Sequence, residues 1–126
     1  MIAKDIMVKN VLTVKPETSI ETAMRLLVDK QISGALVVND QQEIVGVVTG
    51  KDLLVAYDFL HETKSPIKEF ISTKIISIEE NTPVEEISRL LVQGNIKRVP
   101  VVKGKKVVGV VARTDILRWI LQQPSQ

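Results

Sequence analysis

The sequence predicts an α/β fold of the α+β type, built from two β-α-β-β-α repeats packed around a pseudo-twofold axis. Three observations lead to this prediction: an internal repeat, a helix-start pattern found in both copies, and paired runs of β-branched residues. Residues 11–38 match residues 75–102, and residues 44–54 match residues 107–117. A unit of about 60 residues has a marginal core by itself, so we expect the repeats, 1–62 and 63–126, to pack together.

Each repeat contains the pattern of a capping box followed by an amphipathic helix. Thr18 with Glu21, and Thr82 with Glu85, have the spacing at which two side chains satisfy free N–H groups at a helix start. Pro83 is expected at the first helical position of the second copy. Apolar residues then recur at helical spacing and predict one buried face on each helix. The expected buried residues are Ile20, Ala23, Met24, Leu27 and Val28, and in the second copy Val84, Ile87, Leu91 and Val92.

The remaining elements of each repeat are a short first strand, a β-hairpin and a second helix. Residues 11–14 form the first strand, and the hairpins comprise 35–38 with 44–48 and 99–102 with 107–111, each pair joined by a polar turn. Residues 61–68 are expected to connect the repeats, and residues 122–126 form a polar tail that need not be ordered. The expected apolar stripes of the second helices are Leu53, Tyr57 and Leu60, and Ile116, Leu117, Ile120 and Leu121.

Composition limits the classes of function. The chain has 126 residues, 44% of them hydrophobic and only four aromatic, so we expect one compact domain with an aliphatic core. Without cysteine it can form neither disulfides nor thiolate metal ligands, and it has no Cys nucleophile. No secretory leader and no apolar run of membrane-spanning length is present, which favours a cytoplasmic protein without a membrane partner. A net charge of +2 gives weak support for nucleic acid.

One heptapeptide recurs where the last strand of each repeat meets its second helix. Residues 46–52 correspond to residues 109–115, and each copy ends in an aspartate, Asp52 or Asp115. A helix start presents free N–H groups that favour phosphate, and an aspartate there can accept hydrogen bonds from ribose hydroxyls. Lys51 and Arg113 could add an ionic contact to phosphate.

A purely structural interpretation of the same residues stays open. Thr49 and Asp52 have capping-box spacing, and Thr114 could itself cap its helix. The glycine of each heptapeptide could serve packing or a turn. Duplication copies helix caps as faithfully as it copies ligand contacts, so the repetition only partly favours binding.

The paired heptapeptides, each preceded by a strand such as Ile32-Ser33-Gly34-Ala35-Leu36-Val37-Val38, resemble a tandem pair of CBS domains, the Bateman module. Asp5-Ile6-Met7 near the start fits the same family. The resemblance covers nearly the whole chain and therefore implies a stand-alone CBS-pair protein. In that family two repeats form a disc-like pair with two clefts that bind AMP, ADP, ATP or S-adenosylmethionine, and many pairs form homodimers.

The resemblance also implies roles for individual residues. Asp52 and Asp115 would hold ribose hydroxyls, Thr49 and Thr114 would contact ribose or phosphate, and Arg98 stands where this family often reaches phosphate. Family clefts are completed by the opposite repeat. The implied cleft of Asp115 is therefore lined by Leu12, Ile32 and Ser33, and that of Asp52 by Ile76, Ile96 and Lys97. Because Ala112 replaces the hydroxyl of Thr49, the clefts should differ, with the Asp52 cleft the stronger phosphate binder.

No residue pattern supports catalysis. His61 has no neighbouring ligand set for a metal and is interpreted as a connector residue, and no serine lies on a nucleophile elbow. The sequence therefore predicts a non-catalytic regulatory module, without a catalytic cofactor, that binds an adenine nucleotide or S-adenosylmethionine and forms a homodimer. The alternatives are a structural module with vestigial sites and, less favoured, a nucleic-acid binder using the basic turn Lys103 to Lys106. The preferred ligand, the number of clefts filled, the regulated partner and the head-to-head or head-to-tail dimer stay open.

Overall fold

A computed structural model describes residues 1–124, which form two compact units. The first, the 12–75 unit, spans Leu12–Ile75. The second, the C-terminal unit, combines Met1–Val11 with the chain from Ile76 onward. Of the predicted polar tail, Ser125 and Gln126 lie outside the described residues.

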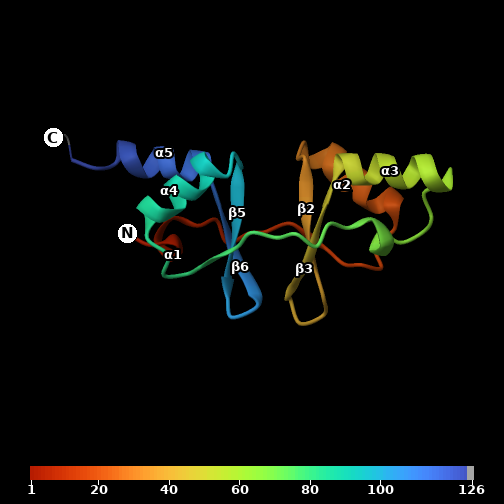
Figure 1. Ribbon diagram of the computed structural model, residues 1–126, viewed down its shortest axis with the longest axis horizontal. Coiled ribbons are helices and arrows are strands. Elements are labelled where there is room, and N and C mark those ends of the chain that lie inside the picture. Colours follow the sequence, from red (N-terminus) through yellow and green to blue (C-terminus); the bar gives the residue numbers. More distant parts are fainter. Residues whose placement is uncertain (125–126) are drawn as a thin grey trace. The chain divides into compact units, whose positions relative to one another are not determined.

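The 12–75 unit is a three-stranded sheet carrying two helices (Figure 1). Strands β1 (Thr13–Val14) and β2 (Gly34–Val38) are parallel, and β2 pairs with β3 (Ile44–Thr49) as an antiparallel hairpin. Helix α2 (Ile20–Lys30) connects β1 to β2, and α3 (Gly50–Leu60) follows β3 directly. A short 3₁₀ helix, η1 (Lys68–Phe70), completes the unit.

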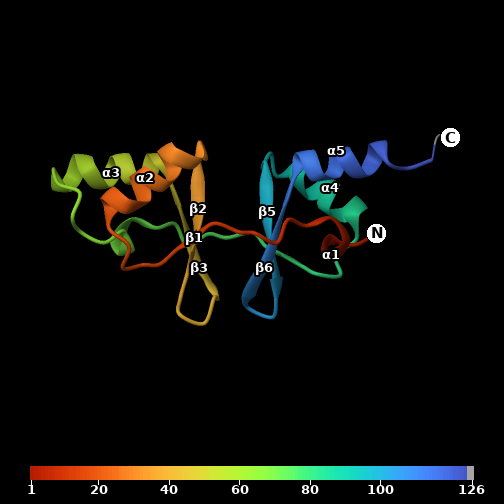
Figure 2. The same cartoon turned by 180° about the vertical axis from the view of Figure 1, so that it is seen from behind.

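The C-terminal unit repeats this order (Figure 2). Its sheet contains β4 (Ile78–Glu79), β5 (Arg98–Lys103) and β6 (Lys106–Ala112), with β4 parallel and β6 antiparallel to β5. Its helices are α4 (Val84–Gln93), α5 (Arg113–Leu121) and the short α1 (Ala3–Ile6). Two sheets of three strands with packed helices confirm the predicted fold class and both hairpins.

The first helix of each repeat starts differently from the prediction. Ser19, not Thr18, is the N-cap of α2, and its hydroxyl accepts a hydrogen bond from the Thr22 N–H at 3.0 Å. Pro83 occupies the N-cap position of α4 rather than the first helical position. The hydroxyls of Thr18 and Thr82 instead accept hydrogen bonds from N–H groups three residues earlier, so the capping-box prediction was wrong at both sites. Local turns before the helices compete for these hydroxyls.

The stripes predicted for α2 and α4 are largely buried, with one exception in each helix. The stripes predicted for α3 and α5 are buried only in part, because Tyr57, Leu117, Ile120 and Leu121 are exposed. Ile20, Ala23 and Leu27 lie in the core, as do their counterparts in α4. Val28 and Val92, in contrast, are 73% and 74% exposed. Eight residues along a helix correspond to a rotation of about 80°, which carries these side chains to the edge of the apolar face. Their predicted burial was wrong in both copies.

The leading segments of the two repeats are exchanged between the units. Residues 1–8 match residues 65–72 at the same spacing as the rest of the repeat, yet each segment packs with the repeat that it does not precede. The Ala3 N–H donates to the Thr82 carbonyl at 2.8 Å, and the Ile67 N–H donates to the Thr18 carbonyl at 2.9 Å. The predicted boundary between residues 62 and 63 divides the chain into sequence repeats, and it stays a prediction. The compact units are divided differently, after residues 11 and 75.

The exchanged segments also extend each sheet by one bridge. Val8 pairs with Val110 of β6, and Ser72 pairs with Val47 of β3, each through two N–H to carbonyl bonds of 2.8–2.9 Å. Ala3 and Ile67, at equivalent positions, are both fully buried. A hydrogen-bonded, buried anchor of this kind makes each leading segment part of the other repeat's core.

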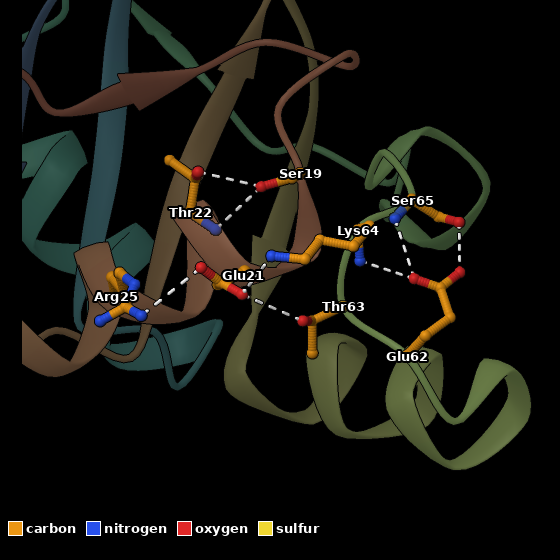
Figure 3. A network of polar contacts seen from close by, with 8 residues as sticks. All are labelled: Ser19, Glu21, Thr22, Arg25, Glu62, Thr63, Lys64 and Ser65. Carbon is orange, nitrogen blue, oxygen red and sulfur yellow. Dashed lines mark hydrogen bonds and ion pairs between the residues drawn. The ribbon is translucent and has the colours of Figure 1, made fainter.

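A polar network fixes the connector to α2 (Figure 3). The Glu21 carboxylate accepts hydrogen bonds from Lys64 Nζ and Thr63 Oγ1, both at 3.2 Å, and lies 3.4 Å from Arg25 Nη2. The Glu62 carboxylate accepts from the Ser65 hydroxyl and from two backbone N–H groups. The predicted connector is therefore an ordered part of the 12–75 unit.

This network predicts a pH-dependent contribution to stability. The hydrogen bond and positive charge of Lys64 lower the pKa of Glu21 below its ordinary value of 4.5. Because the pKa is lower in the folded state, the stabilisation is complete above about pH 4.5 and disappears as the pH falls through the folded-state pKa. We expect Glu21→Gln to lower the unfolding midpoint at pH 7, and this difference to vanish in acid. For the exposed control Glu17→Gln, the difference in midpoint from the wild type should be the same at every pH. The same behaviour for Glu21→Gln would contradict the prediction.

Candidate functional site

The candidate site lies where β3 runs into α3, and an equivalent site lies where β6 runs into α5. Each helix begins at the residue after its strand ends, without an intervening loop. The first N–H groups of an α-helix lack intrahelical partners and carry the positive end of the helix dipole. Both junctions therefore present a polar, positively polarised edge to an incoming ligand.

At the first junction Thr49 and Asp52 form a reciprocal capping box. Asp52 Oδ2 accepts hydrogen bonds from the Thr49 N–H at 2.8 Å and the Thr49 hydroxyl at 2.9 Å. Thr49 Oγ1 in turn accepts from the Asp52 N–H at 3.2 Å. The capping interpretation is confirmed, but the capping bonds use only one of the two carboxylate oxygens of Asp52. Within residues 1–124, Asp52 Oδ1 receives no hydrogen bond and is available to a ligand hydroxyl.

The second junction has the same order of strand and helix, but both carboxylate oxygens of its aspartate accept hydrogen bonds. Asp115 Oδ2 accepts from the Ala112 N–H at 2.7 Å, and Oδ1 accepts from Arg118 Nη1 at 3.1 Å. Asp115 is also buried, with 6% of its surface exposed. Ala112 is the N-cap of α5, so the suggestion that Thr114 caps this helix was wrong; Thr114 is exposed in the first turn. The two junctions consequently differ in the hydrogen bonds of their aspartates.

The hairpin register brings further predicted residues to each junction. In the 12–75 unit, the Gly50 N–H donates to the Ser33 carbonyl at 3.1 Å. In the C-terminal unit, the Arg113 N–H donates to the Lys97 carbonyl at 3.0 Å, and Arg98 is paired with Ala112 across the sheet. An antiparallel hairpin places the start of one strand opposite the end of the next. Ser33 thus lies beside the start of α3 and Lys97 beside the start of α5, and the predicted assignment of each to a cleft stays a prediction.

The remaining predicted residues divide between the two units. Leu12, Ile32 and Lys51 belong to the 12–75 unit with Asp52, and Ile76, Ile96 and Arg113 belong to the C-terminal unit with Asp115. Leu12 and Ile76 are equivalent, exposed apolar side chains. Ile32 and Ile96 are partly buried against their cores. Each unit therefore combines an aspartate at a helix start with two apolar side chains and a basic side chain from the predicted set.

The glycine of each heptapeptide has a packing role. A Cβ on Gly46 would lie 2.7 Å from the Ser72 carbonyl oxygen, and one on Gly109 would lie 2.6 Å from Met7 Sδ. Both glycines therefore make room for an exchanged leading segment. The sequence had left packing and a turn open for these glycines, and it did not indicate which segment packs against them.

Other classes of site find no support in the described part of the chain. Residues 1–124 contain no group of three or more His, Cys, Asp or Glu side chains placed to hold a metal ion. His61 ends α3 and makes an edge contact with the Tyr57 ring. Among the helices described, none is both long and apolar enough to span a membrane.

Comparison with known proteins identifies the family. The CBS domain model matches residues 3–58 and again residues 67–122. The chain belongs to the CBS domain family. This CBS pair is 32% identical over 114 residues to the CBS domain-containing protein YhcV of Bacillus subtilis, covering 90% of this chain and 81% of YhcV. It also matches longer proteins of Methanocaldococcus jannaschii, covering 42% of MJ1225 and 31% of MJ1404, both named as uncharacterized.

Solved CBS-pair structures share the fold and include bound ligands. Arabidopsis thaliana CBSX2 in complex with AMP is 30% identical with a TM-score of 0.81, and the match covers 96% of each chain. The CBS pair of MJ0100, in complex with 5′-methylthioadenosine and S-adenosyl-L-methionine, is 28% identical with a TM-score of 0.74, over 95% of each chain. The tandem CBS arrangement predicted from the sequence is confirmed.

Proposed function

We propose that this CBS pair is a non-catalytic regulatory module that binds adenosine-containing ligands at its two strand-to-helix junctions. The observation that supports this most directly is the open Oδ1 of Asp52, held at a helix start by the capping bonds of Oδ2. A carboxylate fixed in this way can accept hydrogen bonds from ribose hydroxyls without reorganising. The ligands in the CBSX2 and MJ0100 structures are consistent with such a site.

In this proposal the two junctions use equivalent residues. Asp52 and Asp115 bind ribose, Thr49 and Thr114 contact ribose or phosphate, and exposed basic side chains near each helix start hold phosphate. The apolar residues, with the backbone of Ser33 and Lys97, contact the adenine. The basic residues are Lys51, Lys97, Arg98 and Arg113, and the apolar residues are Leu12, Ile32, Ile76 and Ile96.

The two sites should bind with different strength. Asp52 offers a free oxygen and a neighbouring threonine hydroxyl, whereas both oxygens of Asp115 already accept hydrogen bonds. A ligand at Asp115 must displace Arg118 or share its carboxylate oxygen. We therefore expect the Asp52 site to fill first.

Regulation follows if the bound ligand favours one conformation of the protein, because a ligand shifts a conformational equilibrium only when its affinities for the two conformations differ.

Calorimetric titration tests the proposal most directly. We expect heat of binding with at least one of AMP, ADP, ATP, S-adenosylmethionine, 5′-methylthioadenosine and NADH. Asp52→Ala should weaken the tighter site and Asp115→Ala the weaker one, each with a stability loss of about 0.5–2 kcal/mol from the lost helix cap. Asp52→Asn keeps an oxygen for the Thr49 N–H, and should lose affinity with little loss of stability. No binding across the panel at millimolar ligand would exclude the proposed function.

A second proposal, favoured by exposed apolar side chains, is that copies of the chain associate as a homodimer. Large apolar residues on helices of both units are exposed. Large apolar side chains that are exposed to solvent are candidates for an interface. The residues concerned are Val28, Leu54 and Phe59 in the 12–75 unit, and Val92, Leu117 and Leu121 in the C-terminal unit. Sedimentation equilibrium should show a dimer for the wild-type chain, and a monomer would exclude this second proposal.

A further inference from the structure

Arg118 forms an ion pair with the aspartate of the second junction. It follows Asp115 by one turn of α5, and its Nη1 lies 3.1 Å from Asp115 Oδ1. The side chain of Asp115 is only 7% exposed, whereas that of Arg118 is 64% exposed. Removing a carboxylate from water is costly unless its charge is paired. Arg118 therefore compensates the buried charge of Asp115 from the solvent side.

The 12–75 unit carries Val55 at the equivalent position. Val55 is uncharged and 52% exposed, and no ion pair within residues 1–124 includes Asp52. Asp52 is also less buried than Asp115. A ribose hydroxyl can therefore bond to Asp52 Oδ1 without displacing any partner that the structure describes.

At Asp115 the same ribose contact competes with Arg118. A hydroxyl that bonds to Oδ1 can replace the hydrogen bond of the guanidinium, but it cannot replace its positive charge. The buried carboxylate then loses its counter-ion, which lowers the affinity for a neutral nucleoside. A phosphate on the same sugar changes this balance, because it offers the released guanidinium an anion with which it forms bidentate hydrogen bonds.

We propose that Arg118 makes the Asp115 site selective for adenosine ligands that carry a phosphate, whereas phosphate contributes less at the Asp52 site. The inference rests on the proposed function and adds the chemical class of ligand for each site. A nucleotide bonds to Asp115 through its ribose and to Arg118 through its phosphate. A nucleoside without phosphate displaces Arg118 and offers it no anion. The selectivity is a ratio of affinities within one site, and is independent of which site fills first.

Titrations with AMP and with adenosine test the proposal, because these ligands differ only in the phosphate. Each site is measured alone, in a chain in which Asp52→Asn or Asp115→Asn weakens the other site. At the Asp115 site, AMP should bind at least about tenfold more tightly than adenosine. Arg118→Val introduces the residue of the 12–75 unit. It should strengthen adenosine binding and weaken AMP binding, so that the ratio falls at least about tenfold.

The reciprocal change tests the same cause at the other site. Val55→Arg places a guanidinium one turn after Asp52, and should weaken adenosine binding there and raise the ratio of AMP affinity to adenosine affinity. Arg89→Val removes a positive charge from an exposed position on α4. As the matched control, it should leave the ratio at the Asp115 site unchanged. Circular dichroism melts check that each variant is folded.

Three outcomes would overturn the inference, and they are distinguishable. If Arg118→Val left the ratio at the Asp115 site unchanged, the inference would be wrong while the proposed function stood. If this variant weakened AMP and adenosine equally, Arg118 would only hold Asp115 in place and would not select the ligand. If neither ligand, nor any other of the titration panel, bound the wild-type chain, the proposed function would be excluded and this inference with it.

Discussion

Gly46→Ala is expected to destabilise the protein more than Gly109→Ala, although the two glycines are equivalent in the repeat. The added Cβ at position 46 would lie 2.7 Å from the Ser72 carbonyl oxygen, a backbone atom that pairs with Val47. At position 109 the contacts within 3.1 Å all involve the Met7 side chain, which can adopt another rotamer. Overpacking of a core costs about 1–3 kcal/mol, and we expect the upper part of that range for Gly46 only.

Urea unfolding of single and double variants measures this difference. Alanine is entropically favoured over glycine within a strand by about 0.5–1 kcal/mol, so Gly109→Ala should be nearly neutral. Adding Met7→Ala removes Sδ and Cγ, the two atoms nearest to the new Cβ, and should relieve most of the overpacking that remains in Gly109→Ala. Met7→Ala has its own cost in lost apolar contact. No side-chain change can relieve Gly46→Ala. Equal losses of stability for the two glycine variants would show that the leading segments do not dock as closely as described.

A fragment of residues 12–75 is expected to fold cooperatively, whereas a fragment of residues 1–62 is not. The shorter sequence repeat lacks Ile67, which is fully buried, and it lacks the Ser72 bridge to Val47. Phe70 and Ile71, which pack against the same core, are lost as well. Loss of one large buried aliphatic side chain costs about 2–5 kcal/mol, which is comparable to the whole stability of a unit this small.

Thermal melts followed by circular dichroism distinguish the two fragments. A matched experiment on the other unit mixes residues 76–126 with a peptide of residues 1–11. Ala3 of the peptide belongs to the core of this unit, and Ile6, Met7 and Trp119 pack against that core, so docking should change the Trp119 emission. If residues 1–62 melted cooperatively at the midpoint of residues 12–75, the exchanged segments would be dispensable.

Local regularities of the sequence predicted most of the elements. Both hairpins were predicted from β-branched runs and polar turns, because strand pairing across a short turn depends on neighbouring residues. The capping box of Thr49 and Asp52 was predicted for the same reason. The equivalent prediction failed at Thr18 and Thr82, because local turns before the helices take up those hydroxyls.

The two helix starts of the candidate site were predicted from the sequence. The two aspartates stand at helix starts as expected, since a strand-to-helix junction is visible in a short stretch of sequence. The position of Ser33 beside the start of α3 comes from the hairpin register, in which the Gly50 N–H donates to the Ser33 carbonyl. The engagement of Asp115 by Arg118 depends on side-chain conformations that no spacing rule specifies.

The sequence by itself determined that the chain is a duplicated β-α-β-β-α unit with an aspartate at each helix start, because spacing and duplication are properties of neighbouring residues. Only the tertiary structure decided that residues 1–11 complete the second repeat and that residues 65–75 complete the first. Segments 3–7 and 67–71 are similar in sequence, and the sheets of the two repeats are similar as well, so the sequence does not indicate which segment packs on which sheet. Each segment packs closely against a glycine, Gly109 or Gly46, and these contacts join residues far apart in the chain, which local spacing does not specify.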